Sequence, residues 1–266
     1  MTSAGPGWQT ILLRAYAGLF YVFLYVPILV LVVLSFNDSP AMGFPFTGFT
    51  VKWYGSVLAG GELLAAMTNS VTLGTVSAFI ATALALLASL GLRHNFPLRS
   101  LVFPVILIPI VLPGVVSGVL LLVYIGFAGL PYGLWTAVLP AHITWVLPFA
   151  FLTLHPQISR FDPALEEAAM DLGAKPAEAF RRVMFPIIRP ALIATLLFSF
   201  TISFDEFIRT LFVISSERTV PIYLWVLIID RVSPFLPAMG VVLMAISMLV
   251  AGFGFVISQR SPASPQ

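Results

Sequence analysis

Long stretches without a charged residue limit what this sequence can fold into. Residues 100–159 contain no Asp, Glu, Lys or Arg, and residues 15–37 and 63–92 are also uncharged. Only 9% of the 266 residues are charged and 59% are hydrophobic, whereas about a quarter of a soluble domain is charged. One water-exposed domain of this size could not bury so much apolar surface. We therefore expect an integral membrane protein.

The uncharged stretches predict six membrane-spanning helices, because a bilayer core about 30 Å thick requires about 20 helical residues. Residues 100–159 are long enough for two helices, and residues 128–133, rich in turn formers, divide them. The apolar run 219–229 is too short to cross and predicts a short helix or a re-entrant segment. The predicted fold class is all-α, a single polytopic membrane domain over residues 1–266. The expected spans are residues 15–37, 68–92, 100–127, 134–155, 190–215 and 235–257.

Positive charge predicts the orientation of these helices. Nine Lys and Arg residues fall on the face that carries both termini, three fall on the other face, and Arg209 lies inside a span. Loops rich in Lys and Arg stay in the cytoplasm, so both termini are expected there. The first span is longer than the apolar region of a signal peptide and no small-residue cleavage site follows it, so it is expected to remain as an anchor.

Local signals predict where two of the spans begin or bend. The second span is expected to start at residues 68–70, Thr-Asn-Ser, whose side chains can cap a helix. The third span contains Pro104, Pro109 and Pro113, and each proline removes a backbone donor and favours a kink. Two interpretations remain for this span. It is either a kinked helix that only packs, or a helix that lines a translocation path.

Much of the remaining charge lies in the loop between the fourth and fifth spans. Residues 156–190 hold 10 of the 24 charged residues. Asp162 and Pro163 are typical of a helix start, and acidic residues in the next turn suit the positive end of the helix dipole. Gly173 predicts a left-handed stop. A second helix is expected from Pro176, ending where Pro186 and Pro190 interrupt it, so the loop is predicted to form a helix, a glycine corner and a helix.

The first helix of this loop carries an apolar stripe of mostly small residues. Residues 165, 168, 169 and 172, which are Leu, Ala, Ala and Leu, fall at helical spacing on one face. In a soluble domain such a stripe would pack into the core. A membrane protein has little soluble core at this position, so the stripe favours docking into a groove of a partner.

The loop resembles the EAA loop of the permease subunits of binding-protein-dependent ABC importers. The resemblance rests on Glu167-Ala168-Ala169, on Gly173 six residues after the glutamate, and on the prolines at 186 and 190. In that family the loop holds the coupling helix, which sits in a cleft of the cytoplasmic ATPase subunit, and the fold is that of a type I importer. The residues that this implies for ATPase coupling are Glu166, Glu167, Ala168, Ala169, Asp171, Leu172, Gly173, Ala174, Pro186 and Pro190.

The resemblance also implies partners and a location. A permease of this kind pairs with a second homologous permease subunit, two ATP-binding subunits and an external, periplasmic substrate-binding protein. It lies in membrane lipid as a multi-pass protein of the bacterial inner membrane. ATP and Mg are used by the partner ATPase, and this chain is expected to bind no cofactor.

The sequence lacks the signatures of an enzyme. No G-x-x-x-x-G-K-[ST] phosphate loop, H-E-x-x-H or G-x-S-x-G motif occurs, so ATP is expected to be hydrolysed by another subunit. There is no cysteine, and the three histidines have no metal-ligand spacing, so no metal site is predicted. A net charge of +2 gives no reason to expect nucleic acid.

Charge within a predicted span marks a candidate substrate path. Asp205, Glu206 and Arg209 lie in the fifth span, and charged residues inside a membrane usually face a bundle interior or an aqueous cavity. A structural interpretation pairs Asp205 with Arg209 at i,i+4 and leaves Glu206 unmatched. A functional interpretation has Glu206, with Asp205, attract a cation that passes through the cavity. Candidate aromatic partners for such a cation are Tyr124, Trp145 and Trp225.

Residues 199–213, with residues 50–54 and the later Asn69-Ser70, are similar to the polyamine branch of the importer family, which implies putrescine, spermidine or a related small organic cation. Importers of opines, aminoethylphosphonate or iron look alike at this level. Two other classes compete. One is a secondary transporter with Asp205 and Glu206 as a proton or sodium site; the other is an intramembrane enzyme such as a lipid-modifying transferase, for which no nucleophile with a nearby base is found.

Overall fold

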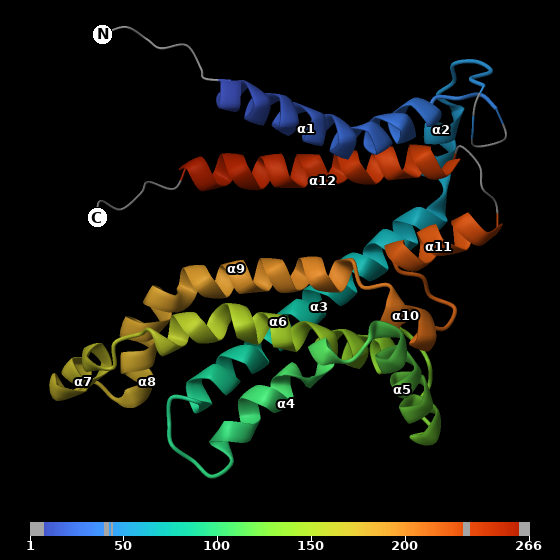
Figure 1. The fold of residues 1–266 in the computed structure, drawn as a ribbon. Coiled ribbons are helices and arrows are strands. Elements are labelled where there is room, and N and C mark those ends of the chain that lie inside the picture. Colours follow the sequence, from blue (N-terminus) through green and yellow to red (C-terminus); the bar gives the residue numbers. More distant parts are fainter. Residues whose placement is uncertain (1–7, 40–42, 44, 231–234, 261–266) are drawn as a thin grey trace, which may run out of the picture. The chain divides into compact units, whose positions relative to one another are not determined.

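The computed structural model describes residues 8–39, 43, 45–230 and 235–260 (Figure 1), and within these residues it consists of helices, turns and one isolated β-bridge between Asn37 and Phe49. The predicted all-α class is confirmed. The chain divides into two compact units. The terminal unit comprises Met1–Leu63 and Leu224–Gln266, and the central unit comprises Leu64–Tyr223.

The terminal unit contains α1 (Trp8–Leu34), α2 (Lys52–Ala59) and α12 (Phe235–Arg260), with α12 packed against both α1 and α2. None of the residues of α1 is buried, although the helix is apolar on every side. A helix of this kind is stable only where lipid or another protein covers it.

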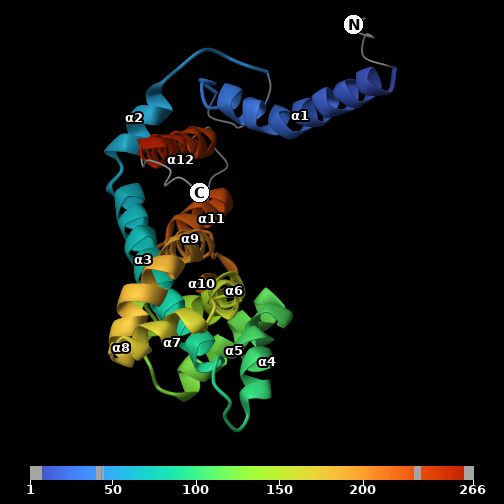
Figure 2. The same ribbon diagram turned by 90° about the vertical axis from the view of Figure 1, so that its left-hand side faces the viewer.

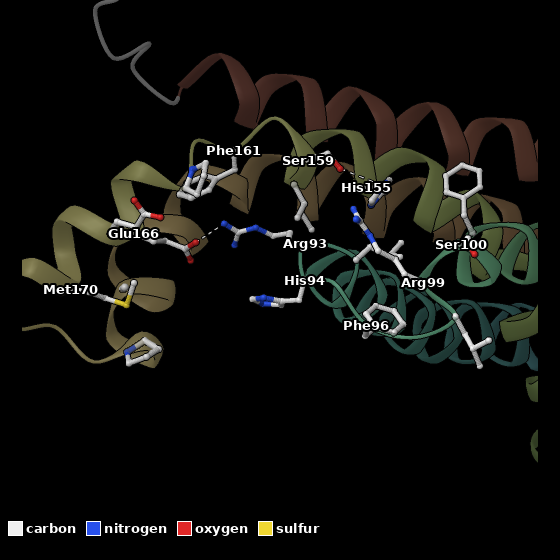
Figure 3. Close-up of a pocket in the computed structure, with 18 residues that line it drawn as sticks. Arg93, His94, Phe96, Arg99, Ser100, His155, Ser159, Phe161, Glu166 and Met170 are labelled. Atoms are coloured by element: carbon white, nitrogen blue, oxygen red, sulfur yellow. Dashed lines mark hydrogen bonds and ion pairs between the residues drawn. The ribbon is translucent and has the colours of Figure 1, made fainter.

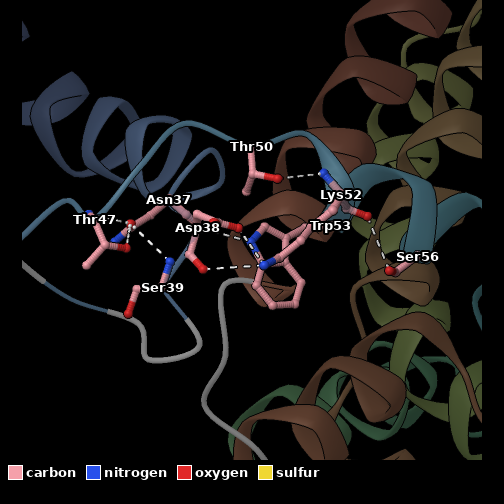
Figure 4. Close-up of polar contacts among 8 residues, drawn as sticks. All are labelled: Asn37, Asp38, Ser39, Thr47, Thr50, Lys52, Trp53 and Ser56. Carbon is pink, nitrogen blue, oxygen red and sulfur yellow. Dashed lines mark hydrogen bonds and ion pairs between the residues drawn. The ribbon is translucent and has the colours of Figure 1, made fainter.

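Asn37 organises the connection between α1 and α2 (Figure 4). Its side-chain oxygen accepts hydrogen bonds from the amide and the hydroxyl of Thr47, at 3.1 and 3.2 Å, and its backbone oxygen accepts one from the Trp53 indole at 2.8 Å. Lys52, at the start of α2, forms an ion pair with Asp38. Asn37 is fully buried, and its hydrogen bonds with Thr47 and Trp53 satisfy its own polar groups, which would otherwise be buried without a partner.

The central unit is built around α6, which packs against both α4 and α9. Buried alanines from α3 and α6, including Ala81, Ala85 and Ala150, lie in its main hydrophobic core with Phe151 and Leu154. Small residues allow helix backbones to approach closely where lipid supplies no hydrophobic drive. Its helices are α3 (Gly61–Gly91), α4 (Arg99–Val111), α5 (Gly114–Phe127), η1 (Leu134–Val138), α6 (Leu139–Ser159), α7 (Ala164–Asp171), α8 (Pro176–Ala179), η2 (Phe180–Met184), α9 (Phe185–Phe204), α10 (Ile208–Val213) and α11 (Val220–Asp230), of which α3 begins and α11 ends in the terminal unit.

Two of the predicted spans are broken. The third span forms α4 and α5, which meet at Pro113 and are bent by 102°. A bend in this span was predicted from its prolines. The fifth span, expected to be continuous over 190–215, ends as α9 at Phe204 and restarts as α10 at Ile208. The two short helices beyond the breaks, α5 and α10, pack against each other.

The second span begins earlier than predicted. Its helix α3 starts at Gly61, so the side chains of residues 68–70 do not cap it. Asn69 instead donates to the backbone oxygen of Arg218 at 3.0 Å, and Ser70 accepts from the amide of Val220 at 2.8 Å. These two polar side chains of α3 hold the start of α11 in place. Helix α11 is the short helix expected near residues 219–229.

The second helix of the charged loop was predicted to end at Pro186 and Pro190, and this prediction is wrong. Helices α8, η2 and α9 follow one another without a gap from Pro176 to Phe204. The π turn η2 ends at Met184, two residues before Pro186, and the Phe185 amide bonds to the Phe180 oxygen. A wider turn gives the proline ring room and removes the need for its missing amide.

By length and composition, four helical segments of the described residues could cross a membrane: Trp8–Leu34, Gly61–Gly91, Leu134–Ser159 and Pro176–Phe204. The bent pair α4 and α5 makes a fifth if it is counted as one span. Six spans and cytoplasmic termini stay predictions.

We expect Gly118→Val to lower the thermal stability of the protein in detergent, because a Cβ at Gly118 would lie 2.4 Å from the Phe212 ring and would force α5 away from α10. The cost of such overpacking is typically about 1–3 kcal/mol. Gly91→Ala is the control, since a Cβ there meets no atom within 4 Å. Equal unfolding midpoints for both variants in scanning fluorimetry would contradict the close packing of these helices.

Candidate functional site

The charged loop between α6 and α9 folds as a helix, a corner and a helix. The Asp162 carboxylate accepts a hydrogen bond from the Ala164 amide at 3.0 Å at the start of α7. Gly173 has a φ of +91°, and the Ala174 amide donates back to the Ala169 oxygen at 3.1 Å. This is the left-handed stop predicted from the sequence, and only glycine adopts it without strain.

The apolar stripe of α7 is exposed. Leu165 is 46% and Leu172 91% exposed, Ala168 is exposed, and only Ala169 is half-buried. Helix α7 contacts α8 and η2, and the three lie together at one end of the central unit in both views (Figure 1 and Figure 2). A large leucine left in the open at the end of a short helix leaves apolar surface available for a partner.

A pocket of about 1080 Å³ lies beneath α7. Figure 3 shows Arg93, from the turn after α3, pointing toward Glu166 of α7, and the two side chains form an ion pair at 2.6 Å. Other lining residues come from the turn between α3 and α4, the first turns of α4, the end of α6 and the charged loop: His94, Phe96, Arg99, Phe103, His155, Ile158, Phe161, Glu167 and Met170. This ion pair was not predicted from the sequence.

The acidic pair at the break after α9 is arranged differently from the prediction. Arg209 pairs with Glu206, at 3.1 Å, and not with Asp205. The reason is the break itself, because i,i+4 spacing brings side chains together only on a continuous helix. Glu206 also accepts a hydrogen bond from the Arg209 amide at 2.8 Å and so caps α10. Asp205 is exposed.

Two side chains from α6, the half-buried Trp145 and the buried His142, join Glu206 and Arg209 in a second cluster, separate from the pocket beneath α7. The Arg209 guanidinium lies 3.6 Å from the centre of the Trp145 ring, a distance typical of a cation–π contact. His142, one turn before Trp145, bridges Ser203 and Thr210 with contacts of 2.7 Å on both ring nitrogens. His142 was not predicted to take part; its i,i+3 spacing from Trp145 is the signal that could have indicated it.

The structure brings together only part of the predicted substrate path. Glu206 and Trp145 meet through Arg209, and Asp205 is the next residue in sequence. Tyr124 is 64% exposed on α5, and Trp225 lies on the part of α11 that belongs to the terminal unit. Among the described residues no group of His, Asp and Glu could hold a metal ion.

Comparison with known proteins gives consistent matches. Residues 81–261 match the family model described as "Binding-protein-dependent transport system inner membrane component". The spermidine/putrescine transport system permease protein PotC of Escherichia coli (strain K12) is 33% identical over 232 residues, 86% of this chain and 87% of PotC. The putrescine transport system permease protein PotI of the same strain is 30% identical over 264 residues, 96% of this chain and 92% of PotI.

A solved structure also resembles this one. It is a bacterial ABC transporter involved in the import of the acidic polysaccharide alginate, with a TM-score of 0.74 and 17% identity over 96% of each chain. A second crystal structure, of a bacterial alginate ABC transporter in complex with an alginate pentasaccharide-bound periplasmic protein, has a TM-score of 0.69. At this level of identity the likeness shows the fold alone.

We expect the Glu206–Arg209 pair to be detectable by its energetics. The two side chains are only 7% and 5% exposed, and removing one partner of a buried pair costs about 3–5 kcal/mol because the other charge is left unpaired. Arg209→Met alone should therefore lower the unfolding midpoint in detergent more than the double variant Glu206→Gln/Arg209→Met. A double variant no more stable than the single one would contradict the pairing.

Proposed function

This chain belongs to the family of inner membrane components of binding-protein-dependent transport systems, in the polyamine branch of the ABC importer permeases, and from this premise we propose that it imports a small organic cation, a polyamine such as putrescine or spermidine. A separate subunit hydrolyses ATP to drive the import. The chain is an integral protein of the inner membrane, and ATP and Mg²⁺ are bound by its partners.

The observation that supports the coupling role is that α7 exposes its apolar stripe while the helix itself packs against α8 and η2. The chain turns at Gly173, and α7 packs against α8 and η2, which continue into α9 without a gap. A displacement of α7 is therefore passed on to α9. Leu165 and Leu172 offer apolar surface to a groove in the ATP-binding subunit. The predicted coupling set divides between two places. Glu166, Glu167, Ala168, Ala169, Asp171, Leu172, Gly173 and Ala174 lie on α7 and its corner, whereas Pro186 and Pro190 lie near the start of α9.

The transport cycle then follows from alternating access. Two ATP-binding subunits close on ATP, draw together the α7 helices of this chain and of a second homologous permease, and turn the pair from inward-facing to outward-facing. A periplasmic binding protein releases the substrate into the outer cavity, and hydrolysis resets the pair. Selectivity resides largely in that binding protein.

A cationic substrate is supported by the relatives and by the second cluster. PotC and PotI are named for spermidine and putrescine, and Asp205 is an exposed carboxylate at a helix break. Glu206 and Trp145 already hold the cationic side chain of Arg209, so this cluster has the chemistry that binds an ammonium group. The alternatives are another small solute, such as an opine, aminoethylphosphonate or iron, and an ion-coupled transporter, which would leave the exposed stripe without a role.

The tagged protein in mild detergent should co-purify with an ATP-binding subunit, and Gly173→Asp or Glu167→Lys should abolish ATP-driven uptake while the protein still reaches the membrane. The first change strains the corner and the second reverses a charge on α7. Gly129→Asp is the matched control, because Gly129 is also left-handed, with a φ of +62°, but lies in the turn after α5. Failure to recover any ATP-binding subunit, or full uptake by both coupling variants, would reject the proposal.

Asp205→Asn should raise the substrate concentration that gives half-maximal polyamine uptake several-fold, with little change in protein level, because the exposed carboxylate pairs with no described residue. Radiolabelled putrescine uptake into proteoliposomes measures this. Glu217→Gln is the control, an exposed acid after α10. Uptake kinetics that are the same for Asp205→Asn and the wild type would contradict a role of Asp205 in binding the substrate.

A further inference from the structure

Arg93 makes an unusual number of contacts for a residue in a short turn. One guanidinium nitrogen, Nη2, lies 2.6 Å from Glu166 Oε2, and the other, Nη1, lies 3.3 Å from the sulfur of Met184. The guanidinium carbon lies 5.5 Å from the centre of the Phe161 ring. The one planar side chain therefore faces an acid, a sulfur and an aromatic ring, which suits the rigid fork of arginine better than it would suit lysine.

These three partners belong to three different parts of the fold. Glu166 lies in the first turn of α7, Phe161 follows the end of α6, and Met184 is the last residue of η2 before α9. Arg93 itself follows α3 by two residues. Beneath it, Leu92, Phe161 and Met184 belong to the main buried core of the central unit. Arg93 is thus the point at which α3, α6, α7 and α9 meet.

The ion pair is partly shielded from water, although both residues line the pocket beneath α7. The side chains of Arg93 and Glu166 are 21% and 18% exposed. The nearby pair of Arg182 and Glu178 spans 3.5 Å, with 69% and 42% exposure. Exposed pairs contribute little, because water and salt screen them, whereas a half-buried pair in a low dielectric is screened much less.

Other basic residues of this turn do not share the role. Arg99 bonds to Asn95 in its own turn, at 3.0 Å, so it makes no link to α7 by this contact. Glu166 lies about 100° around α7 from Leu165, and it is half-buried while Leu165 and Leu172 are exposed. The exposed leucines of α7 therefore stay available to a partner while Glu166 ties the helix to the bundle.

We propose that Arg93 is a positioning residue for energy coupling. It ties α7 to the end of α3, so that a displacement of α7 by an ATP-binding subunit moves α3, α6 and α9 together. This inference rests on the function proposed above and adds a residue outside the loop to the coupling machinery. Without Arg93, α7 keeps its connection along the chain and its packing on α8 and η2 but loses this ion pair with the end of α3, so less of its displacement is passed to α3.

The test compares the number of substrate molecules moved per ATP hydrolysed in proteoliposomes that contain the complete transporter. Arg93→Gln and Glu166→Gln should each lower this ratio by about threefold or more, within the range found for residues that carry coupling between sites. ATPase activity and the amount of bound ATP-binding subunit should stay close to wild type. Arg182→Gln, which removes the exposed pair, should leave the ratio unchanged.

Two further variants separate coupling from folding. The exchange Arg93→Glu/Glu166→Arg should recover part of the lost ratio, because it restores opposite charges. The chain has no cysteine, so Arg93→Cys/Glu166→Cys can be joined by a short bifunctional thiol reagent without other modification. Joining the two positions should raise the ratio above that of the same variant left unjoined, because the link replaces the ion pair.

The outcomes distinguish this inference from the proposed function. A wild-type protein that brings down no ATP-binding subunit would overturn both. A wild-type transporter that assembles and transports, while Arg93→Gln keeps its full ratio, would overturn only the role of Arg93. The same holds if cross-linking residues 93 and 166 lowers transport further, because the two sites would then have to move apart during the cycle.

Discussion

A helix that breaks at membrane depth leaves backbone groups without partners, and in hydrocarbon nothing but protein can satisfy them. The central unit has two breaks between apolar helices, at Pro113 and between Phe204 and Ile208. The helices beyond the two breaks, α5 and α10, pack together. The Glu206 carboxylate accepts a hydrogen bond from the Arg209 amide at the start of α10. The buried polar cluster follows from this need, since the break both frees backbone donors and places a carboxylate among them.

The sequence indicated the class of protein more fully than it indicated the contacts. Stretches without charge predicted apolar helices, and the turn after α5, the short α11 and the corner at Gly173 follow from local residue chemistry. Breaks and pairings were harder to predict. Spacing of i,i+4 favoured Asp205 with Arg209 only if the helix continued, and nothing local shows that Glu166 meets Arg93, which lies 73 positions away. Contacts of that range depend on how helices pack.

The loop combines opposite requirements in one short segment. In the proposed coupling role, α7 has to keep apolar surface uncovered for a partner and has to be attached firmly to the bundle. The fold separates these by face, with Leu165 and Leu172 exposed and Glu166 bound to Arg93. Polar anchoring suits the held side, because an ion pair fixes direction as well as distance, whereas apolar contact on the open side allows a partner to bind and release.

The π turn at Phe180–Met184 has a consequence for how this loop can vary in length. A π turn holds one more residue than the α-helical turn it replaces. Deleting a single residue there would restore ordinary α-helical winding and, because the wider turn absorbs that one residue, would leave the helical segments on either side in nearly the same rotational register. The same deletion in a regular α-helical turn would rotate everything before it by about 100° about the helix axis, so the π turn is the place where this segment can change length by one residue without redirecting the leucines of the loop.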